Sequence, residues 1–270
     1  MRFWGIAVRE HPPPSPLFCT QVLEYETGCW LPISARHQMG TVSSSSSSPS
    51  PVVVLKKTKI KTVAVKAPQA GASTLGLVVL CDSNGTSFDA PPMRRISEAI
   101  ASKGNIFVLC LGLPPADAAD GVSDAEALAE AAQELRTMGA LRIGICGFGT
   151  GADVAMRYAS QGSSDFAACA AAYPTAEATL DSTCLPTVLV LAGLDEGMPK
   201  EKAISFVSTL RGSPAPGQIR NYRDQGRGFV EAGEGDAAEA AVDDVVIFMS
   251  EHLAPVEHWR VGKTLARARY

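Results

Sequence analysis

Three glycines at alternate positions, Gly147, Gly149 and Gly151, follow an apolar run and precede a helical pattern. Glycines at this spacing allow a tight turn from a strand into a helix, and the middle residue of such a turn can present a nucleophile. Nucleophilic catalysis also needs a base that takes the proton of the nucleophile and an acid that orients the base. Two later apolar runs are followed by polar loops that contain Asp195 and Arg227. The turn and the two loops are therefore candidates for a site of acyl-transfer chemistry.

The residues at these positions do not fit that chemistry. Gly149 stands where the nucleophile should be and has no side chain. Arg227 lies in the second of the two loops, and its guanidinium cannot act as a base because it stays protonated at any working pH. The four histidines, at positions 11, 37, 252 and 258, lie outside both loops. Because a buried carboxylate needs a partner, we expect Arg227 to pair with Asp195 or with another nearby carboxylate.

Other residues could serve in their place. Thr150 follows Gly149 directly, where a backbone N–H can bind an oxyanion. Cys81 ends an apolar run and is followed closely by Asp82 and Asn84. Sites in α/β proteins lie at the carboxyl ends of strands, so Cys81 is a candidate relocated nucleophile. We expect Thr150, Asp82, Asn84 and Cys81 to be remnants of an oxyanion or substrate pocket.

The glycine turn also matches a variant of the dinucleotide-binding fingerprint, with Gly147, Gly149 and Ala152 in the G-x-G-x-x-A pattern. In that fingerprint the turn follows the first strand, and an acidic residue ends the next strand about 20 positions later. Here the turn follows the fourth predicted strand, and the next strand ends at Ala172. A nucleotide-binding or small-ligand-binding module stays as a second alternative.

The body of the chain alternates short apolar runs rich in Val, Ile and Leu with helical patterns. Such runs are typical of parallel strands that are buried on both faces. We predict strands at 60–65, 75–81, 105–111, 141–146, 166–172, 187–191 and 218–223, and helices at 91–103, from 123 onward, 151–161, 199–210 and 236–253. The Ser123–Glu126 segment predicts a capping box. This alternation predicts an α/β fold with a mostly parallel sheet of about seven or eight strands and helices on both faces.

The turn and the two loops together resemble the dienelactone hydrolase family of α/β-hydrolases, whose turn has the pattern G-x-C-x-G-G. Residues 192–199 are similar to the segment that carries the acid of that family, and residues 222–230 are similar to its histidine loop. The resemblance covers residues 60–253 and extends weakly to residues 23–28. It implies an α/β-hydrolase fold and a degenerate triad at Gly149, Asp195 and Arg227. With two of three positions changed, it implies a hydrolase that has lost its activity.

Composition and charge exclude several classes of protein. The longest apolar stretches, such as residues 75–81, are far shorter than the ~18 residues of a membrane span. Seven cysteines without a C-x-x-C pair predict neither a zinc site nor a disulfide framework, and they favour a reducing compartment. We expect no cofactor and no metal ion. Residues 59–254 carry 15 basic and 24 acidic side chains, so we expect no nucleic-acid partner.

The two ends of the chain differ from the body. Residues 1–58 include a proline cluster and a run of six serines, and residues 255–270 carry four basic side chains and one acidic one. We predict an extended N-terminal tail at 1–58, a folded domain at 59–254 and a basic tail at 255–270. Such tails suit contacts with protein partners in a larger assembly. The sequence favours a cytoplasmic scaffold, with the cytoskeleton as one setting and a plastid as the less favoured alternative.

Overall fold

The computed structural model describes residues 52–56, 58, 60–65, 74–81, 87–113, 123–233 and 235–254. All of these belong to one compact unit, Ser48–Tyr270. Most of the predicted N-terminal tail (1–58), the weak family likeness at 23–28 and the predicted C-terminal tail (255–270) lie outside the described residues.

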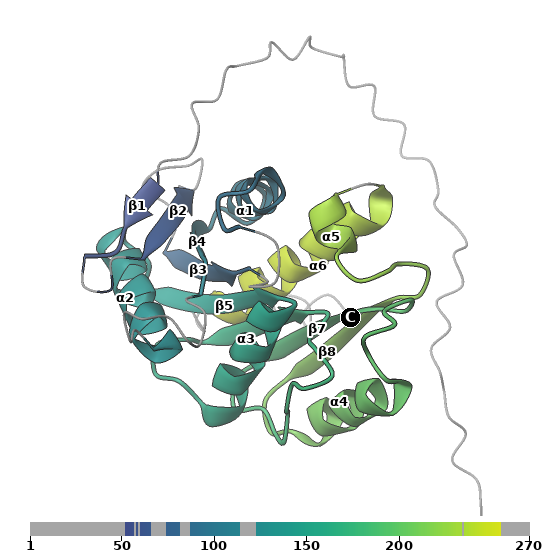
Figure 1. Ribbon diagram of the computed structural model, residues 1–270. Coiled ribbons are helices and arrows are strands. Elements are labelled where there is room, and N and C mark those ends of the chain that lie inside the picture. Colours follow the sequence, from purple (N-terminus) through teal and green to yellow (C-terminus); the bar gives the residue numbers. More distant parts are fainter. Residues whose placement is uncertain are drawn as a thin grey trace, which may run out of the picture. The chain divides into compact units, whose positions relative to one another are not determined.

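A single mixed sheet forms the centre of the described part of the chain, in the strand order β1-β2-β4-β3-β5-β6-β7-β8 (Figure 1). β2 pairs antiparallel with both β1 and β4, and all other neighbours are parallel. The strands are β1 Val52–Val54, β2 Lys61–Val65, β3 Leu75–Leu80, β4 Phe107–Leu111, β5 Arg142–Phe148, β6 Ala168–Ala172, β7 Thr187–Ala192 and β8 Gly217–Tyr222.

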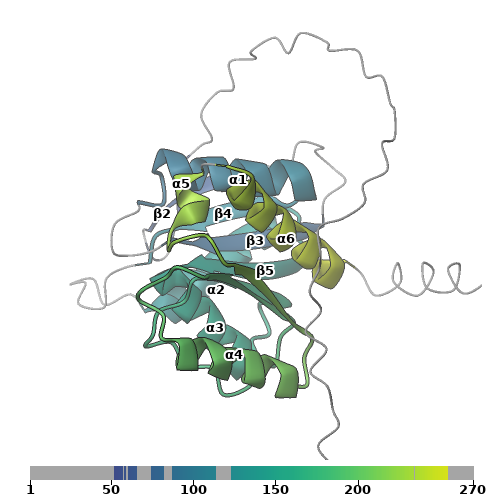
Figure 2. The ribbon, with the colours of Figure 1, turned by 90° about the vertical axis from the view of Figure 1, so that its right-hand side faces the viewer.

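Helices cover both faces of this sheet (Figure 2). They are α1 Pro91–Gly104, α2 Asp124–Thr137, α3 Thr150–Gln161, α4 Lys200–Gly212, α5 Phe229–Ala232 and α6 Asp236–Leu253. One core lies between the sheet and α1, α5 and α6. On the opposite face α2 and α3 form a second core with the sheet, and α3 and α4 form a third. The predicted fold class is confirmed, and burial on both faces explains why the central strands are continuous apolar runs.

The largest difference from the sequence-based prediction is β1. Val52–Val54 pairs with β2 at the edge of the sheet, whereas the sequence-based prediction assigns these residues to the N-terminal tail. The predicted boundary at residue 58 is therefore wrong for these three residues. A run of three β-branched side chains favours a strand, and this preference applies even directly after a serine- and proline-rich segment.

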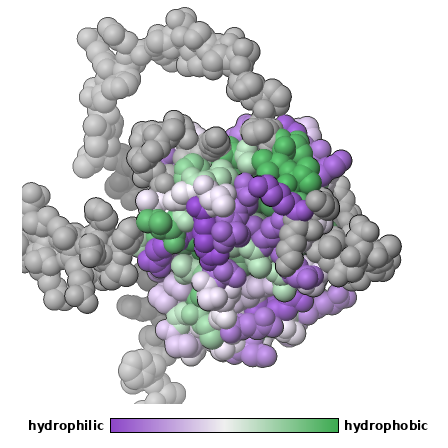
Figure 3. All heavy atoms as spheres, turned by 90° about the vertical axis from the view of Figure 1, so that its left-hand side faces the viewer, coloured by the Kyte–Doolittle hydropathy of each residue, from purple (hydrophilic) through white to green (hydrophobic). Residues whose placement is uncertain are grey.

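Figure 3 shows the face of the molecule that includes the β1 edge, where polar side chains dominate and hydrophobic ones gather in a compact patch. Val52 and Val54 of the edge strand are about half exposed, at 48% and 49%. Among the described residues, no helix combines the length and the apolar character that crossing a membrane requires.

Candidate functional site

The turn from β5 into α3 is held tight by two glycines that leave no room for a side chain. A Cβ added at Gly147 would lie 2.1 Å from the carbonyl oxygen of Gly151, and one added at Gly151 would lie 2.7 Å from that of Leu80. Real Cβ atoms do not approach backbone atoms so closely. The two outer glycines of the motif are therefore required by the packing of α3 against β3 and β5, as the pattern predicted.

Gly149 lies at the apex of this turn, between β5 and α3. Its backbone has φ 57° and ψ −122°, a conformation that glycine adopts without strain and that costs other residues about 1–3 kcal/mol. The Gly149 N–H donates to the carbonyl of Ala172, 3.0 Å away, which ties the apex to the end of β6. Thr150 is the first residue of α3 and is half-buried. The apex has the backbone geometry that presents a nucleophile, but it carries no side chain.

The loops after β7 and β8 cross at close range, and this crossing brings the acid and base positions together. A Cβ at Gly193 would lie 2.4 Å from the carbonyl oxygen of Arg223, so only glycine fits there. The Gly193 N–H donates to the carbonyl of Tyr222, and the Leu194 N–H donates to that of Gln225. These contacts bring Asp195 and Arg227, which are 32 positions apart in the sequence, side by side.

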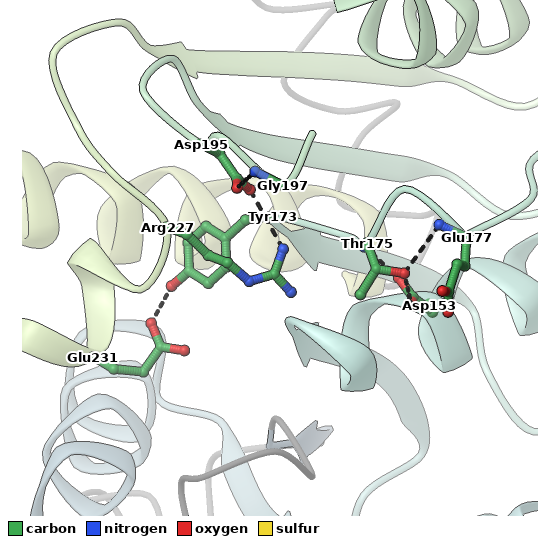
Figure 4. Close-up of polar contacts among 8 residues, drawn as sticks. All are labelled: Asp153, Tyr173, Thr175, Glu177, Asp195, Gly197, Arg227 and Glu231. Carbon is green, nitrogen blue, oxygen red and sulfur yellow. Dashed lines mark hydrogen bonds and ion pairs between the residues drawn. The ribbon is translucent and has the colours of Figure 1, made fainter. Parts of the chain in front are cut away.

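Asp195 and Arg227 meet at this crossing (Figure 4). Nη1 of Arg227 lies 3.4 Å from Oδ2 of Asp195, and the N–H of Gly197 donates to Oδ1 at 2.9 Å. The Asp195 side chain is 3% exposed and that of Arg227 is 32% exposed. The predicted pairing of Arg227 with Asp195 is confirmed. The carboxylate therefore faces a cation that cannot release its proton, at the place where a triad acid would hold an imidazole.

A second polar contact at this edge of the sheet was not predicted. The hydroxyl of Tyr173, at the end of β6, donates to the carboxylate of Glu231 in α5 (Figure 4). Burial, and then the Glu231 charge, raise the pKa of Tyr173 well above its usual value. Its φ of 39° is unusual for a residue with a side chain. The Tyr173 ring packs between Phe148 and Phe229, at centroid distances of 6.2 and 5.9 Å.

A third contact fixes the loop that follows β6. Asp153, in the first turn of α3, accepts hydrogen bonds from the N–H of Thr175 at 2.8 Å and from its hydroxyl at 2.6 Å (Figure 4). This carboxylate at the start of a helix is also favoured by the helix dipole. The first turn of α3 and the loop after β6 are thus one rigid piece beside Gly149.

The structure describes only part of the remaining predicted site residues. Asp82 and Asn84 lie outside the described residues. Cys81 is 2% exposed, and its sulfur lies 3.5 Å from that of Cys110. Cys146 and Cys169 are also buried, as expected for small hydrophobes, and burial raises the pKa of both thiols. Within the described ranges, no cluster of three or more His, Cys, Asp or Glu side chains could hold a metal ion.

Comparisons with known proteins match the chain to the dienelactone hydrolase family and to solved esterase structures. A model of the dienelactone hydrolase family matches residues 112–256, just over half of the chain. No curated protein matches the sequence. Solved structures do match: a putative dienelactone hydrolase from Klebsiella pneumoniae has a TM-score of 0.57 at 14% identity, and covers 71% of this chain and 92% of its own. The Pyrococcus furiosus esterase Pf2001 has a TM-score of 0.60 at 15% identity, and covers 76% of this chain and 92% of its own.

Proposed function

This chain belongs to the dienelactone hydrolase family, as its turn and loops predicted, and from that premise we propose that it is a non-hydrolytic member that acts as a scaffold subunit of a larger protein assembly. The observation that carries the proposal is the pair of Arg227 with Asp195, beside a turn whose apex is Gly149.

Hydrolysis of the family type would need two groups that these positions lack. No atom at Gly149 can attack a carbonyl carbon, and the guanidinium of Arg227 cannot accept a proton. Because Asp195 is paired with Arg227, its carboxylate is not available to orient a base. What is left of the site is a rigid shape, held by the glycine contacts and by the Asp153–Thr175 hydrogen bonds. A rigid body without chemistry suits a docking role.

The scaffold role is supported by the charge distribution along the chain. The segments 1–58 and 255–270 together carry nine basic and four acidic side chains, in contrast to the acidic body. Basic segments favour a partner with an acidic surface. We place this assembly in the cytoplasm, with cytoskeletal structures as the class of partner, and we propose that the two segments make the contacts.

The first experiment measures ester and lactone hydrolysis by the purified wild type and by a Gly149→Cys/Arg227→His double variant. We expect no turnover above the uncatalysed rate for the wild type, and measurable turnover for the double variant because the shape of the site is retained. A Gly149→Cys/Arg211→His variant is the matched control, since Arg211 is exposed at the end of α4.

The alternative is an active hydrolase that uses Cys81, and the esterases among the similar structures make it the main competitor. Wild-type turnover that Cys81→Ala abolishes would overturn the non-hydrolytic proposal. Wild-type turnover that survives Cys81→Ala would overturn both the non-hydrolytic proposal and the Cys81 alternative. It would point to another nucleophile.

A second experiment tests the scaffold role. Native size fractionation of cell extract compares the full chain with a chain that lacks residues 1–47, which keeps β1 and the whole sheet. We expect the full chain in a complex much larger than its 28.3 kDa, and the truncated chain at the size of a free protein. A full chain that migrates as a monomer would contradict this part of the proposal.

A further inference from the structure

A hollow of about 440 Å³ lies between α1, α5 and α6, away from the Asp195–Arg227 pair. These three helices lie side by side on one face of the sheet (Figures 1 and 2). The volume is within the ~300–1,000 Å³ that is typical of small-molecule sites. Neither the family membership nor the proposed function assigns any role to it.

The floor of the hollow is apolar. It is formed by four side chains that are each at most 7% exposed: Ile96, Val230, Ala238 and Val242. Val230 and Val242 also line a second, small apolar cavity together with Phe148 and Ala172. The apolar surface therefore continues inward to the ends of β5 and β6. A ligand with an apolar body would remove this surface from water.

Most charged groups around the rim lie beside a group of opposite charge or at a helix end that favours their charge. Nζ of Lys103 lies 3.0 Å from Glu239 and 2.6 Å from Asp243, so one ammonium group pairs with two carboxylates. Asp236 is the first residue of α6, where the positive end of the helix dipole favours a carboxylate. Arg95 differs from these groups. Its Nη2 donates to the carbonyl oxygen of Glu231 at 2.8 Å, and no described carboxylate forms an ion pair with it.

Arg95 is held in place by the link between α5 and α6. A Cβ at Gly233 would lie 1.7 Å from Nη2 of Arg95, and Gly233 has φ 65°. Only a residue without a side chain lets the guanidinium lie across this link. One donor of the guanidinium is used by Glu231, and a planar guanidinium offers five donors in a fixed geometry. The hollow thus combines a positioned cation with an apolar floor.

We propose that this hollow binds a small amphipathic carboxylate, with the carboxylate on Arg95 and the apolar body on the floor. A carboxylate has the opposite charge to the guanidinium and can accept two parallel hydrogen bonds from it. It also supplies an ion-pair partner for Arg95, which the described carboxylates of the rim do not provide. The apolar body covers Ile96, Val230, Ala238 and Val242.

The test is calorimetric titration of the full chain with octanoate, octan-1-ol and octylammonium. We expect octanoate to bind, and the neutral alcohol and the amine to bind at least about tenfold more weakly, since hydrogen bonds to charged groups contribute ~1.5–3 kcal/mol. Absence of octanoate binding, or equal affinity for octanoate and octanol, would overturn the proposal.

Two variants locate the ligand. Arg95→Gln should weaken octanoate binding about tenfold or more, whereas Arg94→Gln should leave it unchanged. Arg94 is a matched control because its Nε also donates to a backbone carbonyl, that of Asp89 at 2.9 Å, outside the hollow. An unchanged affinity for Arg95→Gln would place the ligand elsewhere and contradict the assignment.

A third variant tests the floor independently of charge. Ala238→Phe fills the hollow and should abolish octanoate binding, while Ala240→Phe, on the exposed face of α6, should not. Thermal melting of both variants shows whether they are folded. These outcomes are independent of the ester assay, so failure of this inference leaves the proposed function intact, and the reverse also holds.

Discussion

At the scale of single residues, the candidate site depends as much on missing side chains as on those present. Gly147, Gly151 and Gly193 each lie where a Cβ would collide with a backbone atom. Gly149 differs from these three, since its position is defined by its backbone angles. The first three glycines maintain the shape of the site, and the fourth leaves the apex of the turn without a side chain.

We predict that Gly147→Ala destabilises the protein by about 1–3 kcal/mol or more. The new methyl group would meet a carbonyl oxygen rather than a flexible side chain, so the strain cannot be relieved cheaply. Denaturant unfolding of the variant measures the loss. Gly212→Ala is the control, because nothing lies within 4 Å of its Cβ position at the end of α4. The control should be neutral or stabilising by about 0.5–1 kcal/mol.

Residue contacts could be predicted only where a pattern constrained both partners. The Asp195–Arg227 pair was predictable because each residue occupies a known position in an ordered set of motifs. The Tyr173–Glu231 contact was not, since its partners are 58 positions apart and neither lies in a motif. The positive φ of Tyr173 has no signal in the sequence either, because tertiary packing imposes it.

At the scale of helices and strands, local chemistry determined most boundaries. α1 ends at Gly104 because Asn105 adopts a left-handed conformation, with φ 49°. β4 therefore begins at Phe107, two residues later than predicted. The short helix α5 was not predicted, since four residues carry no periodic pattern. By contrast, α6 has the bounds that its pattern predicted, 236–253.

Helix α2 provides a prediction at this scale. Ser123 and Glu126 form the predicted capping box, in which Oγ of Ser123 accepts from the N–H of Glu126 and the Glu126 carboxylate accepts from the N–H of Ser123. We expect Ser123→Ala to cost about 1 kcal/mol of stability in denaturant unfolding. Ser123→Asp should retain most of it, because an aspartate caps helices equally well. An unchanged stability for Ser123→Ala would show that the cap contributes little.

At the scale of the whole molecule, the buried thiols make stability depend on pH. Burial raises the pKa of Cys146 and Cys169, on the neighbouring strands β5 and β6. In the unfolded chain a thiol ionises near pH ~8.5, whereas these two stay protonated in the fold. The unfolded state therefore releases protons first, so this contribution is complete below pH ~8.5 and declines as pH rises above it.

We predict that the free energy of unfolding falls above pH ~8.5, by up to about 1.4 kcal/mol per pH unit for each buried thiol. Urea unfolding between pH 7 and pH 10 measures this slope. Cys146→Ala should reduce the slope, whereas Cys184→Ala should not, because Cys184 is exposed. A slope that is the same in both variants would show that the buried thiols do not control the alkaline limit.

The position of α6 has a consequence for synthesis on the ribosome. This helix covers the face of the sheet that includes β5 and β6, yet it is made after every strand of the sheet. Between the translation of Leu75 and that of Leu253 roughly 10 to 35 s pass, at ~5–20 residues per second. Until α6 has been made, the side chains of Cys146, Ala170 and Val190 on this face of the sheet are not covered by it. The nascent chain should therefore be a client of ribosome-associated chaperones, and it should be most prone to misassembly just before synthesis of α6 is complete.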